Sequence, residues 1–504
     1  MRSNGILMHL SSLATDQGIG TMGQAARDFV SFLKEAGQSY WQLLPICPTS
    51  YGDSPYQSFS TFAGNPYFID LDELCAEGLV EKEDYVDINW ESKPDDINYG
   101  VLYEKRYPIL RKAANKFLQQ DPLPKEYHDF CWFNGYWLED YSLFMALKEK
   151  NNGAPWQDWE PALRNYDPHV IWNTKQELSS EMHFWKVLQF LFFKQWYALK
   201  EYANEQGIQI IGDLPIYVSL DSVDVWAHPE LFQLDENKNP KEVAGCPPDG
   251  FSATGQLWGN PLFDWDYMAR DGFSWWVSRI KYLCNVYDML RIDHFRGFES
   301  YYAIPYGDKD ASRGVWRKGP GMDLWRSVDW AIGRQNIIAE DLGFLTEPVR
   351  QMLRESGFPG MKVLEFAFDT RDANCSDYLP HCYPHNCVAY VGTHDNDTIF
   401  GWMKDAAEED VTYAKEYLRL NDPKNYHWDM MCGLWASPAD LTVVQAQDIL
   451  GLDGKSRMNQ PSTVGKNWRW RALPGVFTPE LAKKLRNFCR IYGRLPAEPV
   501  KSEI

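Results

Sequence analysis

The sequence predicts an α/β fold, specifically a (β/α)8 barrel in which parallel strands are enclosed by helices. Short apolar runs bounded by turn residues, typical of buried strands, alternate along the chain with amphipathic patterns of helical spacing. Three of these runs also lead into acidic motifs. Right-handed crossovers of about eight such units close into a barrel, and the chemistry of such a barrel lies at the carboxyl ends of its strands.

The first strand is expected in the opening segment MRSNGILMHLSSLA. Arg2 and a small apolar patch superficially resemble a signal peptide, but His9, Ser11 and Ser12 interrupt the patch. Further strands are predicted at residues 40–46, 208–211, 289–292, 337–339, 363–368, 388–391 and 441–444. Helical patterns between the strands cover residues 24–35, 181–203, 275–286 and 345–355.

Two longer segments interrupt the alternation, so we expect residues 1–504 to form one barrel enlarged by insertions. Residues 72–180 are rich in acidic and aromatic residues and predict a mostly helical insertion subdomain on the barrel rim. Residues 219–260 include AGCPPDGFSATGQLWGNP, whose Gly, Pro, Ser and Thr predict a loop without regular structure. We expect that loop to cover the active site.

The composition of the chain narrows the classes of molecule that it is expected to bind. A formal net charge of -20 argues against nucleic acid and anionic membranes, because binding phosphate chains requires clustered Lys and Arg. A neutral polymer remains compatible with this charge. No apolar stretch approaches the roughly 20 residues of a membrane helix. The 10 cysteines form no dense framework, which favours free thiols in a reducing compartment and hence a cytoplasmic location.

The acidic motifs are LRIDHFRGF around Asp293, IIAEDLG around Glu340 and YVGTHDNDT around Asp395. Two carboxyl groups that flank a glycosidic bond can carry glycosyl transfer, and a third can hold the distorted sugar ring. Arg291, two residues before Asp293 on the same strand face, is expected to keep that carboxylate ionised, whereas the apolar residues before Glu340 raise a carboxyl pKa. The alternative for any single motif is a salt-bridged acid in the core.

Aromatic residues are unusually frequent, with 22 Trp, 28 Tyr and 26 Phe making up 15% of the chain. Most are expected to fill the core. Amphipathic aromatic rings also suit the apolar faces of sugars. Candidates for that role lie in Gly- and Pro-rich loops, namely Tyr51, Tyr56, Phe251 and Trp258.

Two other readings of the motifs are less favoured. The segment GIGTMG at 18–23 matches a dinucleotide fingerprint, but polar residues precede it and no acid follows at the required distance. His294 and His394 adjoin Asp293 and Asp395, so a zinc or manganese site is conceivable. Without an HExxH or clustered Cys/His pattern, we favour hydrogen bonding to substrate. The sequence therefore predicts no metal and no cofactor.

Motifs along nearly the whole chain resemble those of the 4-α-glucanotransferases known as amylomaltases or disproportionating enzymes, family 77 of the glycoside hydrolases. The resemblance rests on YWQLLPICPTSYGDSPYQSFSTFAGNPYFIDL, WLEDYSLFMALK, IIGDLPIYV, PPDGFSATGQLWGNPLFDW, the three acidic motifs, and QDILGL with RMNQPSTVGKNWRWR. It implies a barrel without a separate C-terminal β-sandwich domain. It also implies a substrate of α-1,4-glucan oligosaccharides and polysaccharides, and transfer to the 4-OH of another glucan.

By the same resemblance, Asp293 is the nucleophile, Glu340 the acid/base and Asp395 the stabiliser of the transition state. Further residues are implied in substrate binding. Asp213, His294 and His394 would hold the donor sugar, Tyr56 would stack on the sugar in the cleaved subsite, Gln256 and Trp258 would line the acceptor side, and Arg291 and Asn459 complete the set. At two positions the chain departs from the family pattern, with Gly250 at a loop tip and Ser462 within PST.

Rival functions remain open at this stage. An α-glucan hydrolase would use the same acids and would release reducing ends from maltotriose. A catalytically inactive glucan-binding protein would keep the aromatic residues but would not require all three acids. A metal-dependent hydrolase would be sensitive to chelators.

Overall fold

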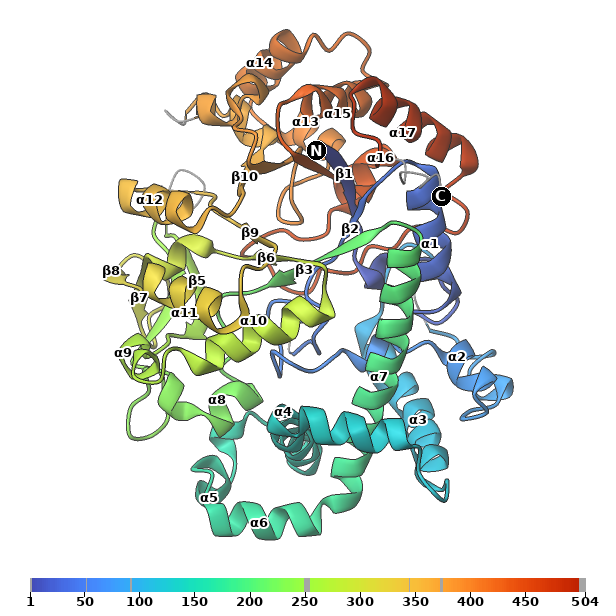
Figure 1. Ribbon diagram of the computed structural model, residues 1–504, viewed down its shortest axis with the longest axis vertical. Helices are drawn as coiled ribbons and strands as arrows, with labels where there is room; N and C mark the ends of the chain where they lie inside the picture. Colours follow the sequence, from blue (N-terminus) through green and yellow to red (C-terminus); the bar gives the residue numbers. More distant parts are fainter. Residues whose placement is uncertain are drawn as a thin grey trace, which may run out of the picture.

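The computed structural model describes residues 2–50, 52–90, 93–248, 254–343, 345–371 and 375–497. Tyr51, Gly250 and Phe251 lie outside this range. Parallel strands form the centre of the molecule (Figure 1). They close into a barrel in the order β1-β12-β11-β10-β9-β6-β3-β2. The predicted fold class is therefore confirmed. The strands are β1 (Ser3–Leu7), β2 (Tyr40–Gln42), β3 (Gln209–Leu214), β6 (Met289–Ile292), β9 (Ile337–Ala339), β10 (Gly360–Val363), β11 (Cys387–Tyr390) and β12 (Leu441–Gln445).

Amphipathic helices enclose the barrel because each has one apolar stripe that must be covered. They are α1 (Gln24–Glu35), α7 (Ser179–Glu205), α10 (Ser274–Val286), α11 (Met322–Ile332), α12 (Glu347–Ser356) and α17 (Pro479–Ile491). The helix α1 has the bounds that the sequence predicted. It packs against α17, and its Phe29 meets Phe477, two residues before α17 begins, edge to face with ring centroids 5.0 Å apart. Thr478 caps α17 by accepting from the Leu481 N–H at 3.2 Å.

The connection from β10 to β11 departs from the regular pattern. The sequence predicted a strand at 363–368, but β10 ends at Val363 and residues Leu364–Phe368 form a 3-10 turn, followed by two more such turns. Glu365 donates its N–H to the carbonyl of Val391 at 3.1 Å, across to the segment after β11. The prediction was wrong because a short apolar run is compatible both with a buried strand and with a buried helical turn.

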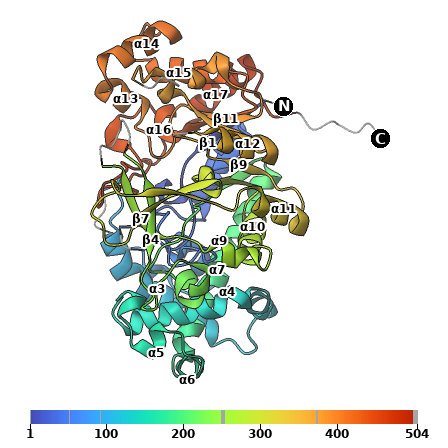
Figure 2. The same cartoon turned by 90° about the vertical axis from the view of Figure 1, so that its left-hand side faces the viewer.

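Two groups of helices extend the barrel. One group lies between β2 and α7: α2 (Leu71–Ala76), α3 (Tyr99–Leu118), α4 (Lys125–Lys150), α5 (Pro161–Arg164) and α6 (Pro168–Glu177). The other lies after β11 and β12: α13 (Ile399–Asp405), α14 (Glu408–Leu418), α15 (Tyr426–Ala436) and α16 (Ala446–Ile449). Figures 1 and 2 place the first group at one end of the molecule and the second group at the other.

The segment 219–260 was predicted to lack regular structure, and this was wrong. It contains α8 (Val223–Ala227), β4 (Glu242–Cys246) and most of β5 (Gln256–Pro261), and α9 (Trp265–Ala269) follows. The strands join β7 (Ser300–Pro305) and β8 (Val315–Lys318) in a four-stranded antiparallel sheet of order β5-β4-β7-β8.

Pairing between distant segments explains why local composition misled. The strand β4 pairs with β7, whose residues lie far along the chain. At Gly245 a Cβ would lie 2.2 Å from the carbonyl oxygen of Gln256, so this glycine permits close pairing with β5 rather than breaking the strand. None of the helices in the described ranges has both the length and the apolar character that crossing a membrane requires.

Candidate active site

Neighbouring barrel strands bring Asp213, Arg291, Asp293 and Glu340 together. Asp213 on β3 pairs in register with Arg291 on β6, and Ile292 pairs with Ala339 on β9. Asp293 and Glu340 are the residues directly after those two strands. Their N–H groups continue the ladder by donating to the carbonyls of Leu214 and Ile292 at 2.9 and 3.0 Å. Both acids therefore lie at the carboxyl ends of adjacent strands.

Arg291 joins two of these carboxylates. Its Nη1 donates to Asp213 Oδ1 and Oδ2 at 2.8 and 2.7 Å, and its Nη2 donates to Asp293 Oδ1 at 3.0 Å. The guanidinium is buried, and the two carboxylates beside it help to hold its pKa well above the ordinary value despite the burial. The permanently charged, planar guanidinium group of Arg291 thus fixes the orientation of the Asp293 carboxyl group.

The pKa values of Asp293 and Glu340 separate in the predicted order. Burial raises the pKa of Glu340 to about 8, with the neighbouring Asp293 adding to the rise. Burial also raises the pKa of Asp293, but Arg291 opposes this, and the result is about 6. The expectation that Arg291 favours the ionised form is right in direction, although burial outweighs it. Arg291 thus favours the ionised form of Asp293, and burial favours the protonated form of Glu340.

His294 connects the acid pair to the antiparallel sheet. Its backbone has a left-handed conformation, with a φ of 51°, and its N–H donates to Glu340 Oε2 at 2.6 Å. The Leu342 N–H donates to Oε1 at 2.9 Å, so two backbone groups orient the Glu340 carboxyl. The His294 ring meets Trp258 on β5 edge to face, with centroids 4.9 Å apart. Trp258 in turn donates its Nε1–H to Gln256 Oε1 at 3.1 Å.

The imidazole of His294 is neutral and has, within the described part of the chain, one unpaired ring nitrogen. Burial, assisted by Arg296, lowers its pKa to about 3, so the ring is neutral. Its Nε2 is buried and makes no hydrogen bond to any described residue. A buried polar atom in this state is costly unless a partner satisfies it.

Tyr56 and His394 form a stacked pair on the other side of Asp213. The Tyr56 hydroxyl donates to Asp213 Oδ2 at 2.7 Å and lies 3.4 Å from His394 Nδ1. The two rings are nearly parallel, with centroids 4.9 Å apart. Burial and the nearby Asp213 hold the pKa of the phenol well above its ordinary value, so Tyr56 remains a donor. Trp468 lies against both rings, at 5.8 and 6.0 Å.

Asp395 lies beside this pair and is held by its neighbours. His394 Nε2 is 3.4 Å from Asp395 Oδ2, and Asn459 Nδ2 donates to Asp395 Oδ1 at 2.6 Å. Asn459, which the sequence assigned to substrate binding, thus contacts the carboxylate of Asp395.

Two chains of direct contacts therefore cross the site. One joins Gln256, Trp258, His294 and Glu340, and the other joins Asp293, Arg291, Asp213, Tyr56, His394, Asp395 and Asn459. The structure brings every side chain that the sequence assigned to the site into this set, since Asp293 and His294 are consecutive. Two residues at the site, Trp468 and Arg457, received no role from the sequence. Both lie in the quoted motif RMNQPSTVGKNWRWR, which was the only signal.

The rival metal reading finds no geometric support in the part of the chain that the structure describes. There, no group of three or more His, Cys, Asp or Glu side chains is arranged to hold a metal ion. We expect initial rates to be unchanged in EDTA, because both histidines are assigned to hydrogen bonding. The measurement compares activity before and after dialysis against the chelator. Inhibition that zinc or manganese reverses would contradict this prediction.

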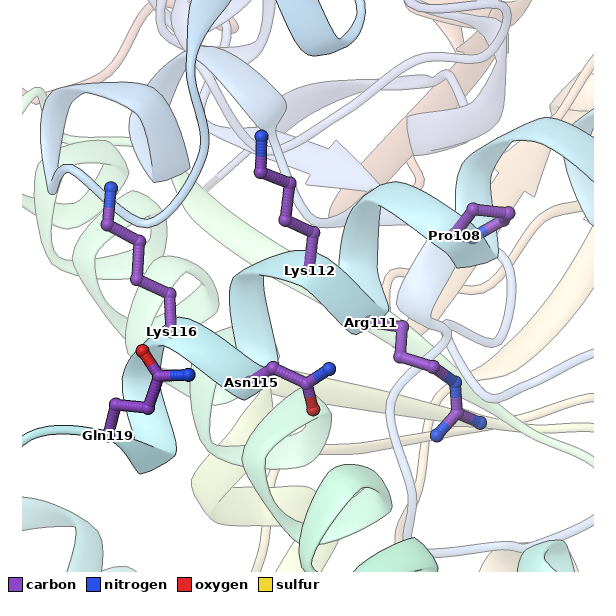
Figure 3. Close-up of a pocket in the computed structure, with 6 residues that line it drawn as sticks. All are labelled: Pro108, Arg111, Lys112, Asn115, Lys116 and Gln119. Carbon is purple, nitrogen blue, oxygen red and sulfur yellow. The ribbon is translucent and has the colours of Figure 1, made fainter.

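A groove on α3 lies in the insertion and is not a competing site. Its lining residues occupy one face of successive turns: Pro108, Arg111, Lys112, Asn115, Lys116 and Gln119 (Figure 3). The three basic groups are paired, with Glu149, Asp84 and Glu81 respectively. Paired surface charges of this kind leave no convergent catalytic groups.

Carboxyl groups at the ends of neighbouring strands, beside aromatic and histidine side chains, are the arrangement expected of a (β/α)8-barrel enzyme. A family model described as 4-alpha-glucanotransferase matches residues 8–475. The chain belongs to this family, glycoside hydrolase family 77, and its activity is 4-α-glucan transfer.

Individual relatives agree over the full length. The 4-alpha-glucanotransferase of Clostridium butyricum is 49% identical over 97% of this chain and 100% of its own. That of Thermus thermophilus is 45% identical over 98% of this chain and 99% of its own. The amylomaltase from Streptococcus agalactiae, solved in complex with acarbose, has a TM-score of 0.96 at 43% identity and covers 98% of this chain and 100% of that chain. The amylomaltase from Corynebacterium glutamicum, at 19% identity and a TM-score of 0.76 over 98% of this chain and 75% of that chain, shares the fold.

Proposed function

We propose that the chain transfers α-1,4-glucan segments from a donor glucan to the 4-OH of an acceptor by a retaining double displacement. The observation that carries this proposal is the pair of carboxyl groups of Asp293 and Glu340 at the ends of adjacent barrel strands, with Arg291 bound to Asp293 and burial raising the pKa of Glu340. A nucleophile must be ionised and an acid must be protonated at the same pH, and the two environments supply those states.

In the first step Asp293 attacks the anomeric carbon while Glu340 gives its proton to the leaving glycosidic oxygen. Arg291 holds Asp293 Oδ1, so we assign the attack to Oδ2. In the second step the Glu340 carboxylate takes the proton of the acceptor 4-OH, which displaces Asp293 from the sugar. Two inversions at one carbon give net retention. Asp395 stabilises the oxocarbenium-like ring in both steps.

The remaining contacts divide into donor and acceptor sides. Tyr56, which is stacked on His394, and Asp213, whose buried carboxylate accepts from the Tyr56 hydroxyl, are assigned to the donor sugar. On the opposite side, Trp258 and Gln256 form a surface along β5 next to His294, and His294 itself stays assigned to the donor sugar. We assign this surface to the acceptor glucan, and the described part of residues 219–260 to covering the active site.

Incubation of the pure protein with maltotriose tests the proposed function. We expect glucose together with a ladder of longer oligosaccharides, while total reducing ends stay constant, because each transfer conserves them. Chromatography of the products and a reducing-end assay measure both quantities. Rising reducing ends without longer products would support the hydrolase alternative instead.

Trp258→Ala is expected to impair the use of acceptor more than cleavage of the donor. The indole is half-buried and presents a face beside His294, and stacking on a sugar is worth on the order of 1 kcal/mol. We therefore expect the KM for acceptor glucose to rise about fivefold or more, and the ratio of hydrolysis to transfer to rise as water competes.

Phe263→Leu provides the matched control, because Phe263 is a buried ring in the same aromatic cluster that does not contact His294. That variant should lose stability without a change in the ratio of hydrolysis to transfer. Equal losses of hydrolysis and transfer in Trp258→Ala would make the indole a packing residue.

A cytoplasmic location is part of the same proposal. All ten cysteines are free thiols, as expected for a protein kept in a reducing compartment.

A further inference from the structure

The segment that carries Asp395 is tied to the segment that carries Asn459 by one guanidinium group, that of Arg457. Its Nη2 donates to the main-chain carbonyl of Asp395, and its Nε donates to the main-chain carbonyl of Asn459 at 2.6 Å. Its Nη1 lies 3.7 Å from the Asp397 carboxylate, which balances the charge. Three nitrogens of a single planar group thus reach two segments that are more than 60 residues apart in the sequence.

These contacts close a ring around Asp395. Arg457 fixes the Asp395 backbone and the Asn459 backbone, and the Asn459 amide then donates to Asp395 Oδ1 at 2.6 Å. Other carbonyls of the same segment are held from β12, since Gln445 Nε2 donates to Thr393 at 2.9 Å and to Asp397 at 3.3 Å. The carbonyl of Asp395 itself accepts a hydrogen bond from Arg457.

The Asp395 side chain depends on hydrogen bonds for its orientation. It is 47% exposed, so packing does not confine it, whereas the Asp213 side chain is fully buried. A carboxylate that stabilises the developing positive charge on a sugar ring does so less well when it is displaced. A shift of about 1 Å lowers the rate by about 100-fold.

We propose that Arg457 is a positioning residue for glucan transfer, which sets the Asp395 carboxylate and the Asn459 amide against the reacting sugar. This inference rests on the role of Asp395 in the proposed function. Arg457 acts through Asp395, so its contribution appears in the transition state more than in ground-state binding. Lysine has one ammonium in place of the planar fork and cannot satisfy both carbonyls and the carboxylate in the same geometry.

The expected result is a fall in kcat of about 10-fold to 100-fold for Arg457→Ala, with the KM for maltotriose changed less than about threefold. Arg457→Lys should recover only part of this loss. The control is Arg469→Ala in the same loop, because Arg469 pairs with Asp96 of the insertion at 2.9 and 2.6 Å and does not contact Asp395. That control should keep kcat within about twofold of the parent value, as expected for a partly exposed ion pair.

A double-mutant cycle separates positioning from mere stabilisation. In the Asp395→Asn background, adding Arg457→Ala should reduce the residual rate on a maltosyl fluoride donor by less than about twofold, because the partner through which Arg457 acts is already impaired. A full multiplicative loss in that background would overturn the inference, as would an Arg457→Ala variant with the parent kcat.

The same cycle distinguishes this inference from the proposed function. If Asp395→Asn is inactive while Arg457→Ala keeps its rate, only the inference fails. If Asp395→Asn keeps full activity, the role of Asp395 fails and the inference fails with it. Circular dichroism and thermal melting check folding, and if Arg457→Ala does not fold, Arg457→Lys is tested in the same cycle against the same criteria.

Discussion

Asp293→Asn is expected to abolish glucan transfer, with a loss of about 10,000-fold or more in kcat on maltotriose. A neutral amide cannot form the ester link of a glycosyl-enzyme, and Asp293 is the ionised member of the acid pair. The fold should survive, because the amide oxygen still accepts from Arg291, and Arg291 keeps its pairing with Asp213. Initial rates and a thermal melt measure the two effects separately.

Asp323→Asn is the matched control, since Asp323 is an exposed acid in the first turn of α11. That variant should keep the rate of the parent protein. If Asp293→Asn retained even a tenth of the parent activity, Asp293 would not be the nucleophile.

Glu340→Gln is expected to lose about 100-fold to 10,000-fold of its rate on maltotriose, because the leaving sugar oxygen then receives no proton. A glycosyl fluoride needs no such proton, so this variant should still form the covalent intermediate. Mass spectrometry after mixing should find the added sugar on Asp293. Full activity on maltotriose, or sugar on a different residue, would remove the assignment of Glu340.

The dependence of kcat/KM on pH tests the same assignment of Asp293 as nucleophile and Glu340 as acid. Activity requires Asp293 to be ionised, so the rate should rise as pH increases through the Asp293 pKa of about 6. It also requires Glu340 to be protonated, so the rate should fall as pH increases through the Glu340 pKa of about 8. In Glu340→Gln, single turnover of the fluoride donor should keep the acidic limb and lose the alkaline one.

Much of the barrel could be predicted because its strands are buried on both faces. Strands such as β6 and β9 appear in the sequence as continuous apolar runs, and Asp293 and Glu340 follow those runs directly. The barrel topology then places both acids at one end of the fold, so the position of the candidate site follows from local pattern and fold class together.

Other parts could not be predicted from local pattern. The strand β4 was missed because its pairing with β7 outweighs the Gly and Pro around it. The run at 363–368 was misassigned because burial alone does not distinguish a strand from a helical turn. Asn459 entered the site by resemblance alone, since nothing in its local sequence indicates contact with Asp395. The loop around Tyr56 indicated a sugar-binding aromatic residue but not its hydrogen bond to Asp213.

By itself, the sequence predicted the parallel barrel, the three candidate acids and the family. Apolar runs indicate which segments are buried, and long matching motifs indicate common ancestry. Only the tertiary structure decided how strongly burial raises the pKa of Asp293 despite Arg291, and that Arg457 joins the segments of Asp395 and Asn459. The physical reason is that desolvation and hydrogen bonding between distant segments arise from the folded arrangement of the whole chain, which no short stretch of sequence encodes.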